Sequence, residues 1–319
     1  MPQHASPSRV AVVGTGNVGA TFAYALLLSG LAAEIVLVDA NHARAEGEAM
    51  DLNHTEPFAR PTRVWAGSYE DCAGAAITVV CAGAGQRPGE TRLDLVRRNA
   101  DIFSEIIPQI ASHNPNGILL IATNPVDVLT YASLRYSGMP ANRVIGSGTI
   151  LDTARFRHLL SRRFHVDARS VHAYIIGEHG DSEVPVWSLA NIAGLRLADF
   201  AELNGTTINR ATMDEIFRQT RDAAYHIIER KGATYYAVAA GLMRIVEAIL
   251  RDQRTVLSVS SIVTDYYGIS DICLSLPTVV GSNGIERVLS LHLDEEEIAG
   301  LKKSASVLKQ TSSQLQLAA

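Results

Sequence analysis

The first half of the chain is built on short apolar runs separated by segments with helical periodicity. These runs occupy residues 10–13, 35–38, 77–81 and 118–121, and residues 144–145 form a shorter one. Unbroken apolar runs of this length are typical of strands buried on both faces of a parallel sheet. Strands that alternate with helices build a doubly wound α/β domain. We therefore predict such a domain over the first half of the chain.

The second half of the chain has a different pattern. Residues 255–264 alternate between apolar and polar, and together with residues 272–276 they predict antiparallel strands. Residues 213–252 indicate a long helical region, which we expect to break near Lys231 and Gly232. A last helix is predicted from about Asp294. These elements predict a second domain of the α+β class.

Two local features refine these predictions. The apolar run at residues 171–176 predicts one buried strand, which ends at Gly177. A helix is predicted over residues 93–112, and Pro108 should bend or break it.

Composition limits the class of protein. The 319 residues are 47% hydrophobic and 19% charged, which is typical of a globular protein of two domains. A net charge of −5 gives no general attraction to nucleic acid or to an anionic membrane, and the apolar runs are too short to span one. The odd number of cysteines (Cys72, Cys81 and Cys273) suits the reducing cytoplasm. No metal-binding motif is present, so we predict no metal site.

A glycine-rich turn follows the first predicted strand. Residues 14–19 read Gly-Thr-Gly-Asn-Val-Gly, and Asp39 ends the next strand, 20 residues after Gly19. In this setting Gly14 allows the tight turn, Gly16 lets a pyrophosphate approach the backbone, and Gly19 lets the helix pack on the strand. The helix N-terminus then faces the phosphates, and Asp39 can accept the ribose hydroxyls. The turn predicts a Rossmann-type domain that binds NAD in preference to NADP.

The segment at residues 177–183, Gly-Glu-His-Gly-Asp-Ser-Glu, presents His179 at the end of an apolar run. Histidine titrates near neutral pH and is a common proton donor and acceptor, although a histidine in a polar turn is the simpler interpretation. Asp152 and Arg155 lie three residues apart and would share one face of a helix. Asp152 could instead be the N-cap of that helix. Arg157 should lean toward another face.

Further polar groups occur where strands or helices end. Asn124 follows the run at 118–121 and would point an amide into the crevice, or it could be only a turn residue before a proline. The segment at 83–92 is rich in glycine and polar groups, which is typical of a mobile loop outside the carboxyl ends of the strands. Thr234 would place a small hydroxyl at the helix break.

Taken together, these motifs resemble the L-lactate dehydrogenases of the lactate/malate dehydrogenase superfamily, in their bacterial form. The resemblance covers nearly the whole chain and is most specific at residues 86–92, 123–127, 151–157 and 177–180. It implies a Rossmann domain at residues 1–147 followed by a catalytic, substrate-binding α+β domain at 148–319. It also implies NAD as cofactor, pyruvate and L-lactate as substrates in the last step of lactate fermentation, and a homotetramer.

The resemblance also assigns roles to individual residues. His179 would be the catalytic acid/base, oriented by Asp152, while Arg92 would polarise the substrate carbonyl. Arg155 would bind the substrate carboxylate. The remaining substrate contacts would be Gln86, Asn124 and Thr234, with a cis bond between Asn124 and Pro125. The cofactor contacts would be Gly14, Gly16, Asn17, Val18, Gly19, Asp39, Gly83, Ala84, Ala122, Asn124, Ser147 and Val238.

Two other functions compete with this one. A malate dehydrogenase of the same superfamily should have an arginine where this chain has Gln86, because oxaloacetate carries a second carboxylate. Arg87 is one residue away, and a shift of the loop could bring it in. A non-catalytic NADH-sensing protein would keep the glycine turn and Asp39 but would not need His179, Asp152 and Arg155. The presence of all three favours an enzyme.

The resemblance extends to a regulatory site. Arg157 and His172 match positions that bind fructose 1,6-bisphosphate between subunits of bacterial lactate dehydrogenases. At a two-fold axis each chain would contribute one arginine and one histidine, which makes a cationic pocket for a bisphosphate. A solvated helix arginine and an ordinary strand histidine are the simpler interpretation. We expect fructose 1,6-bisphosphate to be an activator.

Overall fold

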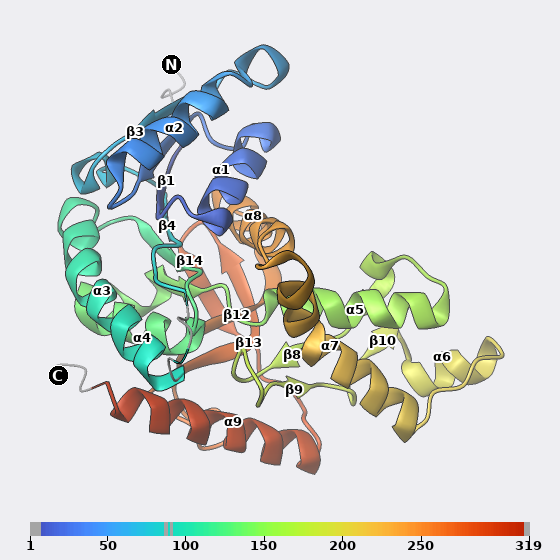
Figure 1. The fold of residues 1–319 in the computed structure, drawn as a ribbon. Helices are drawn as coiled ribbons and strands as arrows, with labels where there is room; N and C mark the ends of the chain where they lie inside the picture. Colours follow the sequence, from blue (N-terminus) through green and yellow to red (C-terminus); the bar gives the residue numbers. More distant parts are fainter. Residues whose placement is uncertain (1–7, 86–88, 90–91, 316–319) are drawn as a thin grey trace, which may run out of the picture.

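The computed structural model describes residues 8–85, 89 and 92–315, and its first half is built on six parallel strands (Figure 1). They are β1 (Arg9–Val13), β2 (Glu34–Val38), β3 (Arg63–Ala66), β4 (Ile77–Val80), β5 (Ile118–Ile121) and β6 (Val144–Gly146). Their order in the sheet is β3-β2-β1-β4-β5-β6, so the strands after β1 are added first on one side of it and then, from β4 on, on the other side. Ligands bind at such a reversal of the strand order in doubly wound sheets. The predicted strands are confirmed, and β3 was not predicted.

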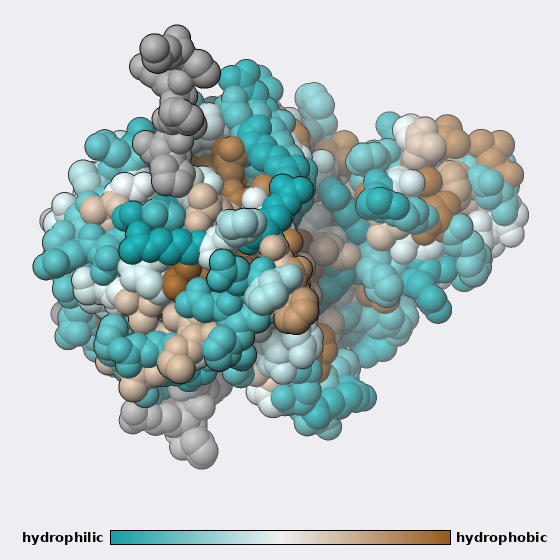
Figure 2. All heavy atoms as spheres, turned by 90° about the horizontal axis from the view of Figure 1, so that it is seen from above, coloured by the Kyte–Doolittle hydropathy of each residue, from teal (hydrophilic) through white to brown (hydrophobic). Residues whose placement is uncertain are grey.

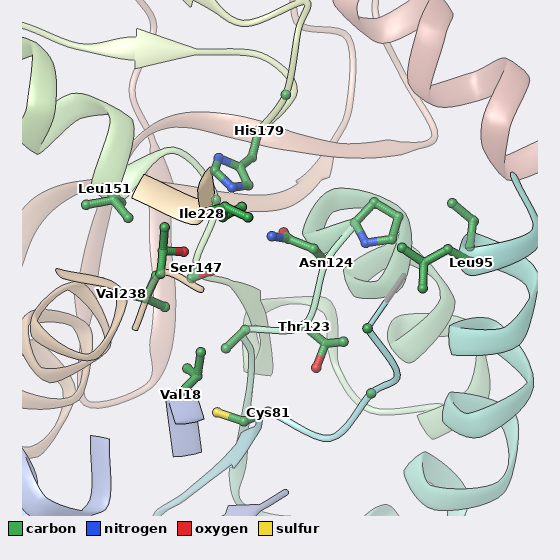
Figure 3. Close-up of a pocket in the computed structure, with 18 of the residues that line it drawn as sticks. Val18, Cys81, Leu95, Thr123, Asn124, Ser147, Leu151, His179, Ile228 and Val238 are labelled. Atoms are coloured by element: carbon green, nitrogen blue, oxygen red, sulfur yellow. The ribbon is translucent and has the colours of Figure 1, made fainter. Parts of the chain in front are cut away.

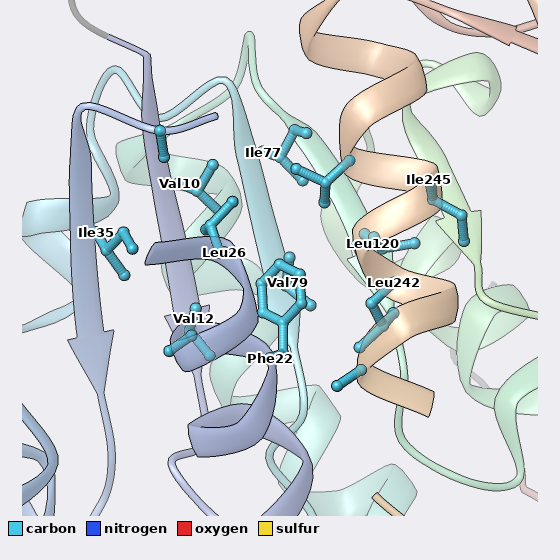
Figure 4. Packing of buried hydrophobic residues seen from close by; sticks show 14 of the residues in the cluster. Val10, Val12, Phe22, Leu26, Ile35, Ile77, Val79, Leu120, Leu242 and Ile245 are labelled. Carbon is cyan, nitrogen blue, oxygen red and sulfur yellow. The ribbon is translucent and has the colours of Figure 1, made fainter. Parts of the chain in front are cut away.

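Helices cover both faces of this sheet because the strand residues alternate between two cores. On one face Val10 and Val12 pack with Phe22 of α1 (Asn17–Ser29) and Leu242 of α8 (Tyr236–Leu250) (Figure 4). The helix α2 (His42–Asn53) contributes to the same core. The other face is covered by α3 (Arg92–His113) and α4 (Val126–Ser137). Because α8 comes from the second half of the chain, the two halves share one hydrophobic core.

The sheet itself continues into the second half. The strands β12 (Thr255–Val263), β13 (Ile272–Gly281) and β14 (Gly284–Val288) are antiparallel, as predicted for the first two. The strand β12 pairs with β6 at a single position, Ser260 opposite Gly146, and this pairing makes one sheet of nine strands. The pattern of apolar residues did not predict this connection. It ties the carboxyl end of β6 to the second half of the molecule.

The other helices and the short strands of the second half form a lobe beside the sheet and a helix beneath it (Figure 1). The helices are α5 (Ile150–Phe164), α6 (Leu197–Leu203), α7 (Arg210–Lys231) and α9 (Glu295–Ser313). The short strands are β7 (Val171–His172), β8 (Ile175–Ile176), β9 (Val184–Pro185), β10 (Asn191–Ile192) and β11 (Leu195–Arg196). Single turns of 3₁₀ helix are η1 (Glu56–Phe58), η2 (Tyr69–Cys72), η3 (Ala141–Arg143) and η4 (Ala168–Ser170).

The structure confirms one sequence prediction about local structure and contradicts two others. The break after α7 is confirmed, because Gly232 adopts φ +85° at its C-terminus. The single strand at 171–176 is wrong: β7 pairs with β10, whereas β8 pairs with β9, so the run divides between two sheets. Pro108 does not break α3, which continues to His113. Pro108 lies on the exposed face, where water can satisfy the carbonyl group that loses its donor.

The surface seen from above is mostly polar, and a groove separates the larger lobe from the lobe of α5 and α6 (Figure 2). In the described part of the chain, no helix is both long and apolar enough to cross a membrane.

Candidate active site

The glycine turn has the geometry that its sequence predicts. Gly14 adopts φ +95°, and a Cβ there would overlap the backbone of Ala82. A Cβ at Gly19 would overlap the carbonyl oxygen of Gly14, so only glycine lets α1 pack this close. A Cβ at Gly16 would meet nothing within 4 Å, and no side chain caps the N-terminus of α1. The turn therefore presents backbone N–H groups to open space, which fits a pyrophosphate.

Asp39 lies at the end of β2 and contacts the same turn. Its Oδ2 accepts the Thr15 N–H at 2.7 Å and the Thr15 hydroxyl at 2.9 Å, and its Oδ1 accepts the Asn41 N–H at 2.9 Å. Partial burial opposes ionisation, but these donors outweigh it and lower the pKa of Asp39. A carboxylate can accept further hydrogen bonds from ribose hydroxyls. Asp39 thus has a structural task in addition to the predicted cofactor contact.

A cavity of about 580 Å³ opens at the carboxyl ends of β4, β5 and β6, where the two halves of the chain meet (Figure 3). Of the predicted site residues it is lined by Val18, Gly83, Ala84, Ala122, Asn124, Ser147, His179, Thr234 and Val238. The cavity also has an apolar wall that was not predicted, formed by Cys81, Leu95, Val96, Leu151 and Ile228. Five predicted cofactor residues do not line it: Gly14, Gly16, Asn17 and Gly19 belong to the adjacent glycine turn, and Asp39 contacts that turn from the end of β2. The glycine turn and the cavity are thus adjacent, as a site for a dinucleotide and a small substrate would require.

His179 and Asp152 form a close pair at this cavity. The distance between His179 Nδ1 and Asp152 Oδ2 is 2.5 Å, and Arg155 Nη1 donates to Asp152 Oδ1 at 2.8 Å. Asp152 stands at the third position of α5, whose N-cap is Thr149, so the N-cap interpretation of Asp152 is wrong. The Asp152 side chain is 3% exposed, whereas that of His179 is 24% exposed. The imidazole therefore faces the cavity with a buried carboxylate behind it.

Electrostatics favours the charged forms of this pair. Burial disfavours the imidazolium, but the charge and hydrogen bond of Asp152 outweigh it and raise the pKa of His179 to about 9. Burial likewise opposes ionisation of Asp152, yet the His179 and Arg155 charges lower its pKa. The ion pair is thus retained at neutral pH, and His179 holds a proton that it can give to a ligand in the cavity.

Asn124 is held by a residue that the sequence did not single out. The Asn124–Pro125 bond is cis, as the resemblance implied. Asn99 of α3 is 1% exposed, its Nδ2 donates to the Asn124 carbonyl at 3.1 Å, and its Oδ1 accepts the Ala84 N–H at 2.8 Å. Asn99 therefore ties the ends of β4 and β5 together. An asparagine on the buried face of an amphipathic helix was the signal that could have revealed it.

Two further acids near His179 were also missed. Asp127, in the first turn of α4, is 1% exposed, and its Oδ2 accepts the His179 N–H at 2.7 Å. Glu183 is 6% exposed, and burial together with the Asp152 charge raises its pKa well above the usual value. Asp127 belongs to the motif at residues 123–127 and Glu183 to the segment at residues 177–183, but only the folded chain places both acids beside His179.

The structure describes the predicted loop at residues 83–92 only in part. Gln86 lies outside the described residues. Arg92 begins α3, but its side chain is not among those described. The root of the loop is described: Arg98 Nη2 donates to the Gly85 carbonyl at 2.8 Å. In the described part of the chain, no cluster of His, Cys, Asp and Glu side chains could hold a metal ion.

Arg157 lies close to the segment that contains His172, and neither residue lines the cavity. Arg157 Nε donates to the carbonyl of Ala173, the neighbour of His172, at 2.9 Å, and its guanidinium lies 5.3 Å from the centre of the Tyr174 ring. Burial lowers the pKa of Arg157, and no described carboxylate forms an ion pair with it. His172 is exposed on β7. The Arg157 guanidinium is thus a partly buried cation without an ion-paired carboxylate among the described residues.

Comparisons with known proteins agree with this geometry. Residues 8–146 match the family model of the lactate/malate dehydrogenase NAD binding domain, and residues 149–316 match that of the lactate/malate dehydrogenase alpha/beta C-terminal domain. The chain is 54% identical to an L-lactate dehydrogenase of Acetivibrio thermocellus and 53% identical to one of Priestia megaterium, each over 95% of both chains.

Solved structures show the same relationship. The chain is similar to a minor L-lactate dehydrogenase from Enterococcus mundtii, with a TM-score of 0.94, 41% identity and coverage of 98% of this chain and 99% of that one. A lactate dehydrogenase from a deep-sea metagenome library gives a TM-score of 0.93 at 43% identity, with the same coverage. The two family domains and the fold show that the chain belongs to the lactate/malate dehydrogenase family, and the His179–Asp152 pair is consistent with this assignment.

Proposed function

We propose that the protein is an NAD-dependent L-lactate dehydrogenase, which reduces pyruvate to (S)-lactate and catalyses the reverse reaction. The observation that carries this proposal is the His179–Asp152 pair at a cavity next to a dinucleotide cradle. Relatives that match nearly the whole chain and are about half identical to it are named L-lactate dehydrogenases, which favours this activity over malate dehydrogenase. The three cysteines are all free, which fits the reducing cytoplasm in which we expect the enzyme to work.

The residues divide the chemistry among them. NADH, when bound, supplies the hydride that adds to the carbonyl carbon of pyruvate. His179 donates its proton to the carbonyl oxygen as negative charge develops there, and Asp152 fixes the ring and stabilises the imidazolium. Arg155 keeps guanidinium donors beyond its bond to Asp152, and these are available for the carboxylate of the substrate. In the reverse reaction neutral His179 removes the hydroxyl proton of lactate.

Other residues position the substrate and exclude water. Asn124 and Thr234 line the cavity and would contact substrate and nicotinamide. The apolar side chains of Leu95, Val96 and Ile228 suit the methyl group of pyruvate better than a second carboxylate. Arg92 would polarise the substrate carbonyl from the end of the loop, and closure of the loop would exclude water.

The choice between pyruvate and oxaloacetate is tested at Gln86. Absorbance of NADH gives kcat/KM for each substrate in the wild-type enzyme and in Gln86→Arg. We expect the wild type to prefer pyruvate and the variant to move toward oxaloacetate by about tenfold or more, because a new cation would pair with the second carboxylate. Wild-type preference for oxaloacetate would overturn the proposed activity. An unchanged ratio in the variant would show that residue 86 does not face the substrate.

We further propose a homotetramer that is activated by fructose 1,6-bisphosphate at Arg157 and His172. Arg157 supports this idea because it is partly buried and no described carboxylate neutralises it, so an anion would relieve the unpaired charge. Two copies of the pair across a two-fold axis would repel each other without a ligand. A bisphosphate would then favour the assembled, active state.

A further inference from the structure

The backbone around His179 is held by three different elements. Gly177 exchanges two backbone hydrogen bonds of 2.9 Å with Ser275 of β13. The Glu178 N–H donates to the Ser304 hydroxyl of α9 at 2.6 Å, and the His179 N–H donates to Asp127 of α4 at 2.7 Å. Three successive N–H groups thus have three separate partners. Of these partners, only Asp127 carries an ionisable side chain.

Asp127 has few other contacts for a buried carboxylate. Its Oδ1 accepts a long hydrogen bond of 3.4 Å from Ser275, and the side chain is 1% exposed. In the described part of the chain, no lysine or arginine forms an ion pair with it. The titratable groups that face it are His179 and Glu178 from the turn and the Cys273 thiol from β13. The only one of these that can carry a positive charge is His179.

Burial raises the pKa of Asp127 to about 6, while the nearby Ser260 hydroxyl, the backbone N–H of His179 and the charge of His179 act in the opposite direction. Asp127 is therefore mostly ionised at neutral pH. A buried charge without a cation is unfavourable, so the carboxylate and the imidazolium stabilise each other. Three acids thus face His179: Asp152 at its ring, Asp127 at its main chain, and Glu183, whose own pKa burial raises well above the usual value.

We propose that Asp127 is a positioning residue for the proton-transfer step, which fixes the main chain of His179 and whose negative charge helps the imidazole to keep its proton. This inference rests on the proposed function, because it concerns the acid/base of that reaction. Asp127 would therefore have two roles: it accepts the His179 N–H, and it supplies negative charge near the imidazole. An amide oxygen could accept the His179 N–H, but only a carboxylate also supplies charge.

The test compares Asp127→Asn, which keeps an oxygen acceptor and removes the charge, with Asp127→Ala, which removes both. The measurement is the pH dependence of kcat/KM for pyruvate reduction and for lactate oxidation. In Asp127→Asn we expect both inflections, which report the protonation of His179, to shift to lower pH by about half a unit or more. Asp127→Ala should show the same shift and a plateau roughly tenfold or more lower, which Asp127→Asn restores.

Asp101→Asn, on the exposed face of α3, is the matched control and should keep the wild-type inflection. NADH binding and thermal melting show whether each variant is folded, and Asp127→Ser provides a second neutral side chain if Asp127→Asn does not fold. Wild-type inflections in a folded neutral variant would overturn the charge role. A wild-type plateau in folded Asp127→Ala would overturn the positioning role. Failure of the wild-type enzyme to reduce pyruvate would instead overturn the proposed function.

Discussion

At the scale of single residues, the chemistry depends on how acids surround one histidine. The sequence offered Asp152 as an acid that could share a site with His179, and the fold adds Asp127 and Glu183. Burial alone would lower the pKa of an imidazole, but the neighbouring carboxylates outweigh burial and raise the pKa of His179 to about 9. The side chain is therefore an acid that is charged at neutral pH and exposed to the cavity on one side.

Replacement of the histidine tests its role directly. We expect His179→Asn to lower kcat for pyruvate reduction by roughly 10²–10⁴-fold, because the variant has no group that can donate the proton. NADH binding, measured by fluorescence titration, should remain close to that of the wild type because the cradle is built from other residues. Near-full turnover in the variant would remove His179 from the mechanism.

The raised pKa predicts a particular pH profile. Pyruvate reduction needs the imidazolium, so kcat/KM should be constant at neutral pH and fall above an inflection near 9, by roughly tenfold per pH unit. Lactate oxidation needs the neutral ring and should rise through the same region. Steady-state rates between about pH 6 and pH 10.5 provide the measurement. An inflection near the ordinary value of 6.5 would show that the carboxylates do not support the imidazolium.

At the scale of elements, the first β-α-β unit does two things at once. Gly14 and Gly19 let α1 pack against the strands, and this leaves the N-terminus of α1 open. Asp39 at the end of β2 holds the turn through Thr15 while it keeps acceptor capacity for a ligand. The glycine turn and the acid are thus one cooperative structure, which their separation in the sequence does not reveal.

Asp39→Ala tests this element. We expect weaker NADH binding and less discrimination against NADPH, because the carboxylate that accepts ribose hydroxyls and repels a 2′-phosphate is lost. Fluorescence titration with both cofactors measures the two effects. Thr15→Val is the control, since it removes one contact to Asp39 and keeps the charge. An equal loss of affinity for both cofactors would indicate a structural role alone.

At the scale of the whole molecule, the site exists because the two halves interlock. The strand β12 extends the sheet beyond β6, and α8 packs on the core of the first half. This arrangement brings His179, Thr234 and Val238 into one cavity with Asn124 and Ser147, which lie at the carboxyl ends of the parallel strands. Figure 3 shows His179 and Val238 in this cavity together with Asn124 and Ser147. Arg157 and His172 lie on the α5 and β7 side, linked to His179 through the chain from residue 172 to 179.

Activation by fructose 1,6-bisphosphate at Arg157 and His172 would involve the whole molecule. Fructose 1,6-bisphosphate should shift the pyruvate saturation curve of the wild type to lower concentrations near neutral pH, and Arg157→Gln should abolish this response. Arg162→Gln, an exposed arginine on the same helix, is the charge-matched control. A wild-type curve that does not respond at low protein concentration would contradict the proposal.

Much of the fold was predictable because its signals are local. Buried parallel strands must be apolar along their whole length, and a tight turn with a close helix needs glycine, so residues 10–38 reveal the Rossmann unit by themselves. The antiparallel alternation at residues 255–264 is equally local. The resemblance to lactate dehydrogenases then supplied the roles of His179, Asp152 and Arg155, which spacing alone left open.

Tertiary structure decided what depends on contacts between distant segments. The sequence of the apolar run at 171–176 does not show that it forms two strands, because it is their different partners that separate them: β7 pairs with β10 and β8 pairs with β9. Asn99 and Asp127 look like ordinary polar residues in helices until folding buries them against Asn124 and His179. Nor does the sequence show that β12 joins β6 or that α8 completes the first core. Local patterns determine which elements form, whereas burial and long-range pairing determine which side chains meet and which of them keep their charge.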